Sequence, residues 1–363
     1  MNPLKRVFGN FFSAGLFISF LLFFKSVSGQ YDFSETDRLL KNHQHLLGND
    51  VVTLVYKDGK IIFSKEQGRF KNNTEIPVAS CSKWLTAAMV MTFVDEGKLS
   101  LDDSIGKFLP VFTRYGKGDI KIRNCLSHTT GLESGAMNLF SILREYRKRQ
   151  LMDSLGEEVN GFAKNKKRIA EPGTEFRYSN IGLNIAGHIL EVISGKKFEV
   201  LFQERIAIPL DMGHTSFTQG RGLPDPSGSA FSTANDYMHF LIMILQKGVY
   251  NGKRILSEKS VNQMQKPQIS LGMVKYAPSP AEGYVYALGE WVEETDKNGN
   301  SEVVASPGLF GTWPLVDNCH QYACIFLIQS ILSRKQRDVY VEIKKSIDQQ
   351  ILSSCTSSDR KGL

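Results

Sequence analysis

Ala-Ser-Cys-Ser-Lys-Trp, at residues 79–84, opens an apolar run that continues to residue 94. Apolar residues on every side are typical of a helix that is enclosed by protein. If Ser80 begins that helix, Lys83 lies one turn further along the same face, where its amine can reach the Ser80 hydroxyl. A serine hydroxyl is a poor nucleophile near neutral pH and needs an adjacent base, and a buried lysine can serve as one. The stretch therefore predicts a serine nucleophile and a lysine base on a buried helix.

The Ser-x-x-Lys spacing is a weak signal by itself, because the chain contains it four times. The other three copies are Ser104/Lys107, Ser194/Lys197 and Ser358/Lys361. The first lies in a turn-like segment, the second is interrupted by a glycine typical of a helix end, and the third lies in a polar C-terminal tail. Only Ser80 precedes a long apolar run, so its surroundings single it out.

The composition is that of an ordinary globular chain, with 363 residues of which 42% are hydrophobic and 22% charged. This length allows one large domain or two interleaved ones. The formal net charge is +7, and subtracting the three basic residues of the first 29 leaves +4, too little and too dispersed to indicate nucleic acid binding. No zinc-ligand spacing or phosphate-binding loop occurs. We therefore expect a small-molecule or peptide substrate and neither a metal nor an organic cofactor.

Residues 1–29 have the order of a secretory signal. Lys5 and Arg6 precede an apolar core at residues 11–24, and Val-Ser-Gly at residues 27–29 suits cleavage before Gln30. The alternative is an uncleaved N-terminal anchor, because the apolar core with its flanks is only slightly short for a bilayer span. In both cases the folded part is exported. We expect a periplasmic or secreted protein, associated with a membrane if this segment stays attached.

Strand-like runs lie near both ends of the chain, and helical segments lie between them. A hairpin is predicted at residues 51–64, and further short strands at 284–289, 302–305, 310–316 and 322–328. This order predicts an α+β fold, in which an antiparallel sheet built from both chain ends is flanked by helices and a mostly helical region is inserted. The predicted boundaries are 30–79 and 283–353 for the sheet region, 80–282 for the helical region, and 354–363 for a flexible tail.

The five cysteines, an odd number, cannot all pair within one chain. We expect Cys81, beside the proposed nucleophile, to be a small buried hydrophobic residue rather than a second nucleophile. Cys319 and Cys324 could pair across a bend. A disulfide framework is not indicated in a chain of this size.

Several short motifs follow one another along the chain. They are Ala-Ser-Cys-Ser-Lys at 79–83, Leu-Ser-His-Thr-Thr-Gly-Leu at 126–132, Pro-Gly at 172–173, Tyr-Ser-Asn at 178–180, Pro-Leu-Asp-Met-Gly at 209–213 and Ser-Thr-Ala-Asn-Asp-Tyr at 232–237. In these motifs and in their order, the chain resembles the serine beta-lactamase and penicillin-binding-protein superfamily, in particular its class C beta-lactamase-related branch. The resemblance covers roughly residues 35–350. It implies a beta-lactamase/DD-peptidase-like fold and an exported serine hydrolase that acts on an ester or amide.

The resemblance also assigns roles to four residues. Ser80 would be acylated, Lys83 would hold or accept its proton, and Tyr178 would act as a general base or as a proton relay to the leaving group. Asn180 would hydrogen-bond the substrate and Lys83. The chemistry agrees with these roles, because a phenol with a pKa of about 10 becomes a useful base only beside a positive charge, which Lys83 supplies.

The chain departs from the family at its third motif. The family usually carries Lys-Thr-Gly, or His in the first place, on a strand beside the site, and the matching stretch here is Ser306-Pro-Gly308. The resemblance gives Ser306 and Gly308 substrate-binding roles, and the Leu309 N–H would complete an oxyanion hole with that of Ser80. Because the cation is missing, a substrate carboxylate would lose a charged partner unless an arginine replaces it, either Arg177 or one from the basic segment at residues 133–168. We therefore expect neutral esters or amides to be better substrates than penicillins or D-alanyl peptides.

Two other features admit functional interpretations. His128 invites a Ser-His mechanism, but no Gly-x-Ser-x-Gly elbow surrounds any serine, so a buried and hydrogen-bonded histidine is the better interpretation. The polar and basic segment at residues 133–168 could be a lid or a partner-binding surface, although a charge run of this kind is usually a solvated helix face. For the chain as a whole, the alternative to an enzyme is a penicillin-binding-like receptor or scaffold without turnover. The intact Ser80, Lys83, Tyr178 and Asn180 favour the enzyme.

Overall fold

The computed structural model describes residues 31–135, 144, 147–149, 151–219 and 222–355, together with the backbone of 360–361. The chain divides into two units between Tyr31 and Asp32, and the compact unit described below begins at Asp32. The predicted signal segment lies outside the described residues. Across the part of the chain that the structure describes, no helix has both the length and the apolar character needed to cross a bilayer.

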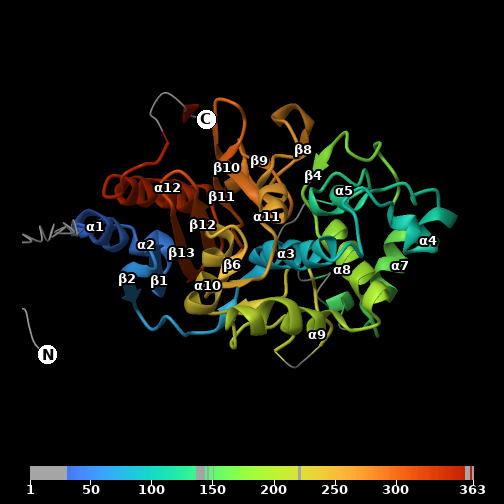
Figure 1. The fold of residues 1–363 in the computed structure, drawn as a ribbon, viewed down its shortest axis with the longest axis horizontal. Helices are drawn as coiled ribbons and strands as arrows, with labels where there is room; N and C mark the ends of the chain where they lie inside the picture. The colour runs from blue at the N-terminus through green and yellow to red at the C-terminus, as the bar shows by residue number, and fades with distance from the viewer. Residues whose placement is uncertain are drawn as a thin grey trace, which may run out of the picture. The chain divides into compact units, whose positions relative to one another are not determined.

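An eight-stranded antiparallel sheet lies at one side of the inserted helices (Figure 1). Its strands follow the order β14-β10-β11-β12-β13-β1-β2, and β9 pairs with β10. The strands are β1 Val51–Lys57, β2 Lys60–Gln67, β9 Val285–Tyr286, β10 Trp291–Asp296, β11 Ser301–Ala305, β12 Gly311–Asp317, β13 Tyr322–Gln329 and β14 Arg360–Lys361. In the register of β1 and β13, Val51 lies opposite Ile328 and Lys57 lies opposite Tyr322. The predicted α+β fold, with one sheet made from both chain ends, is confirmed.

Helices make up most of the remaining regular structure in the described part of the chain. They are α1 Ser34–Asn42, α2 Gln44–Leu47, α3 Ser82–Asp95, α4 Pro110–Arg114, α5 Ile122–Leu126, α7 Leu155–Asn165, α8 Ile181–Ser194, α9 Phe198–Phe202, α10 Ala234–Leu245, α11 Glu258–Gln265 and α12 Arg334–Asp348. Short strand pairs link some of them: β3 Ile76–Pro77 with β5 Phe231–Ser232, β4 Phe176–Arg177 with β8 Val274–Tyr276, and β6 Val249–Tyr250 with β7 Lys253–Arg254.

Helices α10 and α12 cover opposite faces of the sheet. On β13, the Phe326 ring stacks on Tyr340 of α12, with ring centroids 4.9 Å apart. The neighbouring Ile325 and Leu327 instead join the hydrophobic core that includes α10. Because successive side chains of a strand point to opposite faces, this alternation places the sheet between the two helices.

Helix α3 is the most enclosed element near the motifs. Every residue from Ser82 to Phe93 is buried, and the helix packs against α8, α9 and α11. The turn between β9 and β10 also touches α3, and a Cβ on Gly289 would lie only 2.6 Å from the Cβ of Ala87. Glycine is therefore required where the sheet meets this helix.

Strand β10 of the large sheet was not predicted, although its neighbours β9 and β11 and the following strands β12 and β13 were. Its sequence, Trp-Val-Glu-Glu-Thr-Asp, reads as a polar loop from composition alone. In the fold, Glu293 is buried and accepts a hydrogen bond of 3.0 Å from the indole N–H of Trp313. A hydrogen-bonded acid thus occupies a strand position where a buried residue is usually hydrophobic.

Cys319 and Cys355 form a disulfide, with Cα atoms 5.2 Å apart. The suggested pairing of Cys319 with Cys324 is wrong, because Cys324 lies inside β13, paired to Val55 on one side and to Leu315 on the other. Cys81 is fully buried, as predicted for a small hydrophobic residue, and burial raises the pKa of its thiol. The disulfide joins the turn after β12 to a residue of the predicted flexible tail.

Candidate active site

Ser80 lies at the entrance to α3. It sits on a single 3₁₀ turn, Ala79–Cys81, and the α-helix itself begins at Ser82, so Ser80 precedes the helix rather than opening it. Ala79 has a φ of 47°, a left-handed conformation that costs an L-residue roughly 1–2 kcal/mol. The Ser82 hydroxyl holds this turn, because it donates to the Ala79 carbonyl at 2.6 Å and accepts from the Ala230 N–H at 3.0 Å.

Lys83 is fully buried, and its Nζ lies within hydrogen-bond distance of three acceptors. The acceptors are the Ser80 Oγ at 3.1 Å, the Asn180 Oδ1 at 3.2 Å and the Ser227 carbonyl oxygen at 2.7 Å. The Nζ also lies 4.9 Å from the centre of the Tyr178 ring. These contacts bring together the four residues that the sequence singled out, and they add the Ser227 carbonyl, which no motif had indicated.

Tyr178 is placed by the backbone pairing of β4 with β8. Its N–H donates to the Tyr276 carbonyl at 3.1 Å, and its ring stacks on Trp291 with centroids 5.4 Å apart. Burial raises the pKa of the Tyr178 hydroxyl, and a hydrogen bond with Ser80 only partly opposes that effect. Tyr178 is therefore a protonated phenol in the resting site, positioned to donate a proton.

The His128 ring packs against the Tyr178 ring, with centroids 4.6 Å apart, and its polar partners are residues other than Ser80. Its Nδ1 accepts the Ser179 backbone N–H at 3.4 Å, and its Nε2 lies 3.1 Å from the Tyr286 hydroxyl. Burial and the nearby positive charge of Lys83 hold the pKa of His128 well below its usual value, so the imidazole is neutral. A neutral ring that accepts at Nδ1 carries its proton on Nε2 and donates it to Tyr286. The predicted buried, hydrogen-bonded histidine is confirmed.

The stretch at 306–309 forms the wall behind the nucleophile. Ser306 is buried, and its hydroxyl donates to the Gly289 carbonyl at 3.2 Å and lies 3.5 Å from the Ser80 carbonyl oxygen. Ser306 is absent from the lining of the pocket at Ser80, so a direct contact with substrate has no geometric support. Gly308 does line the pocket, and a Cβ there would lie 2.3 Å from the Val78 carbonyl oxygen. Only glycine fits this close approach.

Leu309 and Ser80 both line that pocket, as an oxyanion hole would require. Among the described residues, neither backbone N–H is engaged in a hydrogen bond to another residue. Two unengaged N–H groups at one pocket can receive the negative oxygen of a tetrahedral intermediate.

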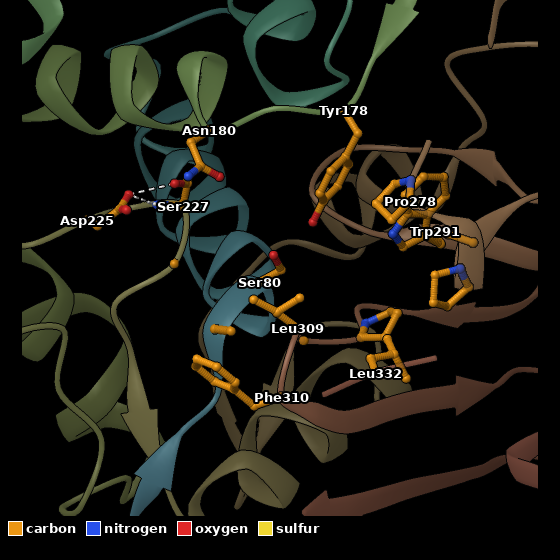
Figure 2. Close-up of a pocket in the computed structure, with 16 residues that line it drawn as sticks. Ser80, Tyr178, Asn180, Asp225, Ser227, Pro278, Trp291, Leu309, Phe310 and Leu332 are labelled. Atoms are coloured by element: carbon orange, nitrogen blue, oxygen red, sulfur yellow. Dashed lines mark hydrogen bonds between the residues drawn. The ribbon is translucent and has the colours of Figure 1, made fainter. Parts of the chain in front are cut away.

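The pocket at Ser80 has two chemically different sides (Figure 2). Figure 2 shows Tyr178, Pro278, Trp291 and Leu332 on one side of Ser80, and Asn180, Ser227 and Asp225 on the other. The lining residues that the structure describes are Ala79, Ser80, Tyr178, Asn180, Asp225, Ser227, Gly228, Pro278, Pro280, Ala281, Trp291, Pro307, Gly308, Leu309, Phe310 and Leu332. None of these residues is a lysine, arginine or histidine. No sequence motif indicated Asp225, the prolines at 278 and 280 or Phe310.

A second pocket adjoins the first at Asn180 and is lined by part of the basic segment, including Arg144, Lys148 and Lys166. Within this segment Arg149 is buried, and its Nη2 donates to both carboxylate oxygens of Glu158, at 2.6 and 2.7 Å. The predicted solvated face therefore holds at Arg144 and Lys148, which are exposed, but not at Arg149.

Arg177 does not replace the missing cation. Its guanidinium pairs with Glu175 at 3.1 Å, and it does not line the pocket.

One buried cluster has the composition of a metal site, but a lysine fills it. The carboxylates of Asp317 and Asp348 and the ring of His320 lie close together. The Lys344 ammonium lies 2.8 Å from the Asp317 carboxylate and 2.9 Å from the Asp348 carboxylate, where a cation would bind. The cluster is best explained as an ion-pair network that fastens α12 to the sheet.

Comparisons with known proteins agree with this geometry. The sequence model of the beta-lactamase family matches residues 42–339. A curated relative, protein Rv1367c of Mycobacterium tuberculosis, is 25% identical over 342 residues, covering 77% of this chain and 85% of its own length.

Two solved structures have the same fold. A putative beta-lactamase from Bacteroides dorei is 30% identical with a TM-score of 0.76, and the match covers 88% of this chain and 98% of that one. The hydrolase EstCE1, described as having promiscuous acyltransferase activity, is 19% identical with a TM-score of 0.72, and the match covers 86% and 97% of the two chains. Because the identity is low, this match supports the fold and says nothing about activity. From the family match and the Bacteroides dorei structure, we conclude that this chain belongs to the beta-lactamase family of serine hydrolases.

Proposed function

We propose that this protein is an exported serine hydrolase that forms an acyl-enzyme on Ser80 and prefers esters or amides without a carboxylate to penicillins and D-alanyl peptides. The observation that carries the proposal is the set of hydrogen bonds from Lys83 to Ser80 and Asn180, beside a protonated Tyr178. Burying a cluster of polar and ionisable side chains costs free energy, and such clusters are found mainly at functional sites. The cluster therefore favours an enzyme over a scaffold without turnover.

The proposed reaction has two steps. In the first, Lys83 acts in its deprotonated form, as a neutral amine, and takes the proton of the Ser80 hydroxyl. The Ser80 oxygen bonds to the substrate carbonyl carbon, while the N–H groups of Ser80 and Leu309 stabilise the oxyanion. Tyr178 then donates a proton to the departing oxygen or nitrogen, and the carbon–leaving-group bond breaks. In the second step, water attacks the acyl-enzyme, the proton transfers reverse, and Ser80 is regenerated with release of the acid.

The preference for substrates without a carboxylate rests on the charges around the pocket. Among the described residues its lining contains no cation, and Asp225 contributes a carboxylate. A carboxylate on the substrate would be desolvated without a charged partner, which costs on the order of several kcal/mol. We therefore expect weak beta-lactamase and DD-carboxypeptidase activity.

Export is supported by the Cys319–Cys355 bond. Disulfides persist mainly in oxidising compartments, such as the periplasm or the extracellular space. Together with the leader-like residues 1–29, the bond favours a periplasmic or secreted enzyme. If the leader is not cleaved, we propose that it attaches the enzyme to the membrane.

Intact-mass measurement tests the nucleophile. The wild-type protein and Ser80→Ala are each treated with a fluorophosphonate and, separately, with a penicillin. We expect a fluorophosphonate adduct on the wild type and none on Ser80→Ala. An adduct that persists in the variant would disprove Ser80 as the nucleophile, and no adduct on the wild type with either reagent would favour the scaffold.

The substrate preference is tested with nitrocefin and p-nitrophenyl butyrate on one preparation. We expect the ester to have the higher kcat/KM. Nitrocefin turnover at about 10⁴ M⁻¹s⁻¹ or above, within the ordinary enzyme range, with negligible ester cleavage would contradict the preference.

A further inference from the structure

Asp225 faces the catalytic pocket from the side opposite Tyr178 (Figure 2). Its Oδ1 accepts two hydrogen bonds from Ser227, one from the backbone N–H at 3.0 Å and one from the hydroxyl at 2.6 Å. The Arg149 guanidinium lies 3.5 Å from the same oxygen. Among the described residues, no group donates to the other oxygen, Oδ2, so Asp225 offers the pocket one unused carboxylate oxygen.

Arg149 is shared between two carboxylates, because its Nη2 also donates to both carboxylate oxygens of Glu158. Burial opposes the ionisation of Asp225, but the positive charge of Arg149, the hydrogen bonds from Ser227 and the weaker effect of the Lys83 charge outweigh it and lower its pKa. The carboxylate is therefore ionised at neutral pH.

The geometry of the proposed reaction decides which part of a substrate meets Asp225. Tyr178 protonates the leaving group, so the leaving group lies on the side of Tyr178 and Trp291. The acyl group, which is bonded to the same carbonyl carbon, then extends across Ser80 toward Asn180, Ser227 and Asp225.

We propose that Asp225 selects substrates whose acyl group carries a positive charge, such as an amine or a quaternary ammonium, a few bonds from the carbonyl. This inference rests on the proposed function, and it names the acyl-side recognition of that site. A positively charged group on the acyl chain would pair with the unused Oδ2, whereas a negatively charged group there would be repelled. The apolar side at Pro278, Trp291 and Leu332 would accept an apolar leaving group.

The test uses three p-nitrophenyl esters with the same leaving group and nearly the same acyl shape. They are the 4-(trimethylammonio)butanoyl ester, its neutral isostere with a 5,5-dimethylhexanoyl group, and the anionic 4-sulfobutanoyl ester. We expect the wild-type kcat/KM for the cationic ester to exceed that for the neutral one by about fivefold, the upper end of the range for one exposed ion pair. The sulfonate should be the poorest substrate.

Asp225→Asn removes the charge but keeps an oxygen that can accept both Ser227 hydrogen bonds. The ratio of cationic to neutral kcat/KM should fall about fivefold in this variant, and taking the ratio within each variant cancels any general change in activity. The matched control is Asp338→Asn on α12, which removes a carboxylate whose side chain is 62% exposed and should leave the ratio unchanged.

Each outcome has a separate meaning. Equal kcat/KM values for the cationic and neutral esters, or an unchanged ratio in Asp225→Asn, would overturn the role of Asp225 and leave the proposed hydrolase intact. A preference for the sulfonate would also overturn it and would point to Arg144, Lys148 and Lys166 in the adjoining pocket. Failure of the wild type to hydrolyse any of the three esters would overturn the proposed function and this inference together.

Discussion

Two buried lysines in this protein have opposite surroundings. Lys83, at the proposed active site, donates to three neutral oxygens: a hydroxyl, a side-chain amide and a backbone carbonyl. Lys344, on α12, lies within 3.3 Å of three carboxylates, those of Asp317, Asp348 and Glu294. Both side chains are almost inaccessible to solvent. They therefore differ in the charge of their neighbours and not in burial.

The difference shows what each lysine can do. Burial by itself would lower the pKa of Lys344, but the three carboxylates outweigh it and raise that pKa, so its proton is fixed and its role is structural. Around Lys83, the three hydrogen-bond acceptors are uncharged and one of them is the nucleophile. A lysine that exchanges a proton with a neighbour needs such uncharged partners, because a directly bonded carboxylate would hold the ammonium in place.

Removal of Lys83 tests the catalytic side of this comparison and should have the largest effect. Lys83→Ala and Tyr178→Phe should each lower kcat by about 10²-fold to 10⁴-fold, the range for positioned proton-transfer groups, with little change in the melting temperature. Steady-state kinetics on the preferred ester give kcat, and thermal melts serve as the control. The losses should not add, and a double variant slowed by the full product of the single losses would show that the two residues act independently.

Removal of Lys344 tests the structural side. Lys344→Met should lower the free energy of unfolding by about 3–5 kcal/mol, because it leaves Asp317 buried without its cation. The kcat of the folded fraction should not change. Urea denaturation measures the effect, with Lys345→Met, the exposed neighbour on α12, as the control. A loss below about 1 kcal/mol would show that the network around Lys344 does not depend on its charge.

A buried acid near Lys344 extends the comparison to pH. Burial raises the pKa of Glu293 to about 7 from 4.5, and the charge of Lys344 only partly opposes this. Since the folded-state pKa is the higher one, the favourable contribution of Glu293 is fully present below pH 4.5 and is lost as the pH rises through about 7. Glu293→Gln should therefore match the wild type near pH 4 and be more stable at pH 8, by up to about 3 kcal/mol. Parallel stability curves across that range would contradict the raised pKa.

An exposed lysine should show the smallest effect. Lys107, in another of the Ser-x-x-Lys copies, pairs with Asp103 at 2.9 Å, and its side chain is 57% exposed. Lys107→Ala should change the free energy of unfolding by less than about 0.5 kcal/mol and leave kcat unchanged, since exposed ion pairs contribute little. The same two assays apply. A large loss of activity here would mean that the spacing alone, rather than burial, marks the catalytic copy.

The sequence was informative where a residue type is tied to a local pattern. The apolar run after Ser80, the β-branched hairpin at residues 51–64 and the single Tyr-x-Asn each follow from short-range rules, and the structure confirms the strands and brings Tyr178 and Asn180 to Ser80. The position of Asp225, the Ser227 carbonyl and the Cys319–Cys355 bond depend on contacts between distant segments. No local pattern encodes such contacts. Strand β10 was missed for another reason: Glu293 is buried in the fold, but in the sequence an acidic residue at this position is more typical of an exposed loop.

The three acceptors around Lys83 come from separate parts of the chain. Asn180 lies 97 residues after the lysine, and Ser227 lies 144 residues after it. A partly folded chain in which the segments of Asn180 and Ser227 have not docked onto α3 lacks two of the three oxygens that hold the Lys83 amine. Regain of ester hydrolysis during refolding would then report the docking of these segments.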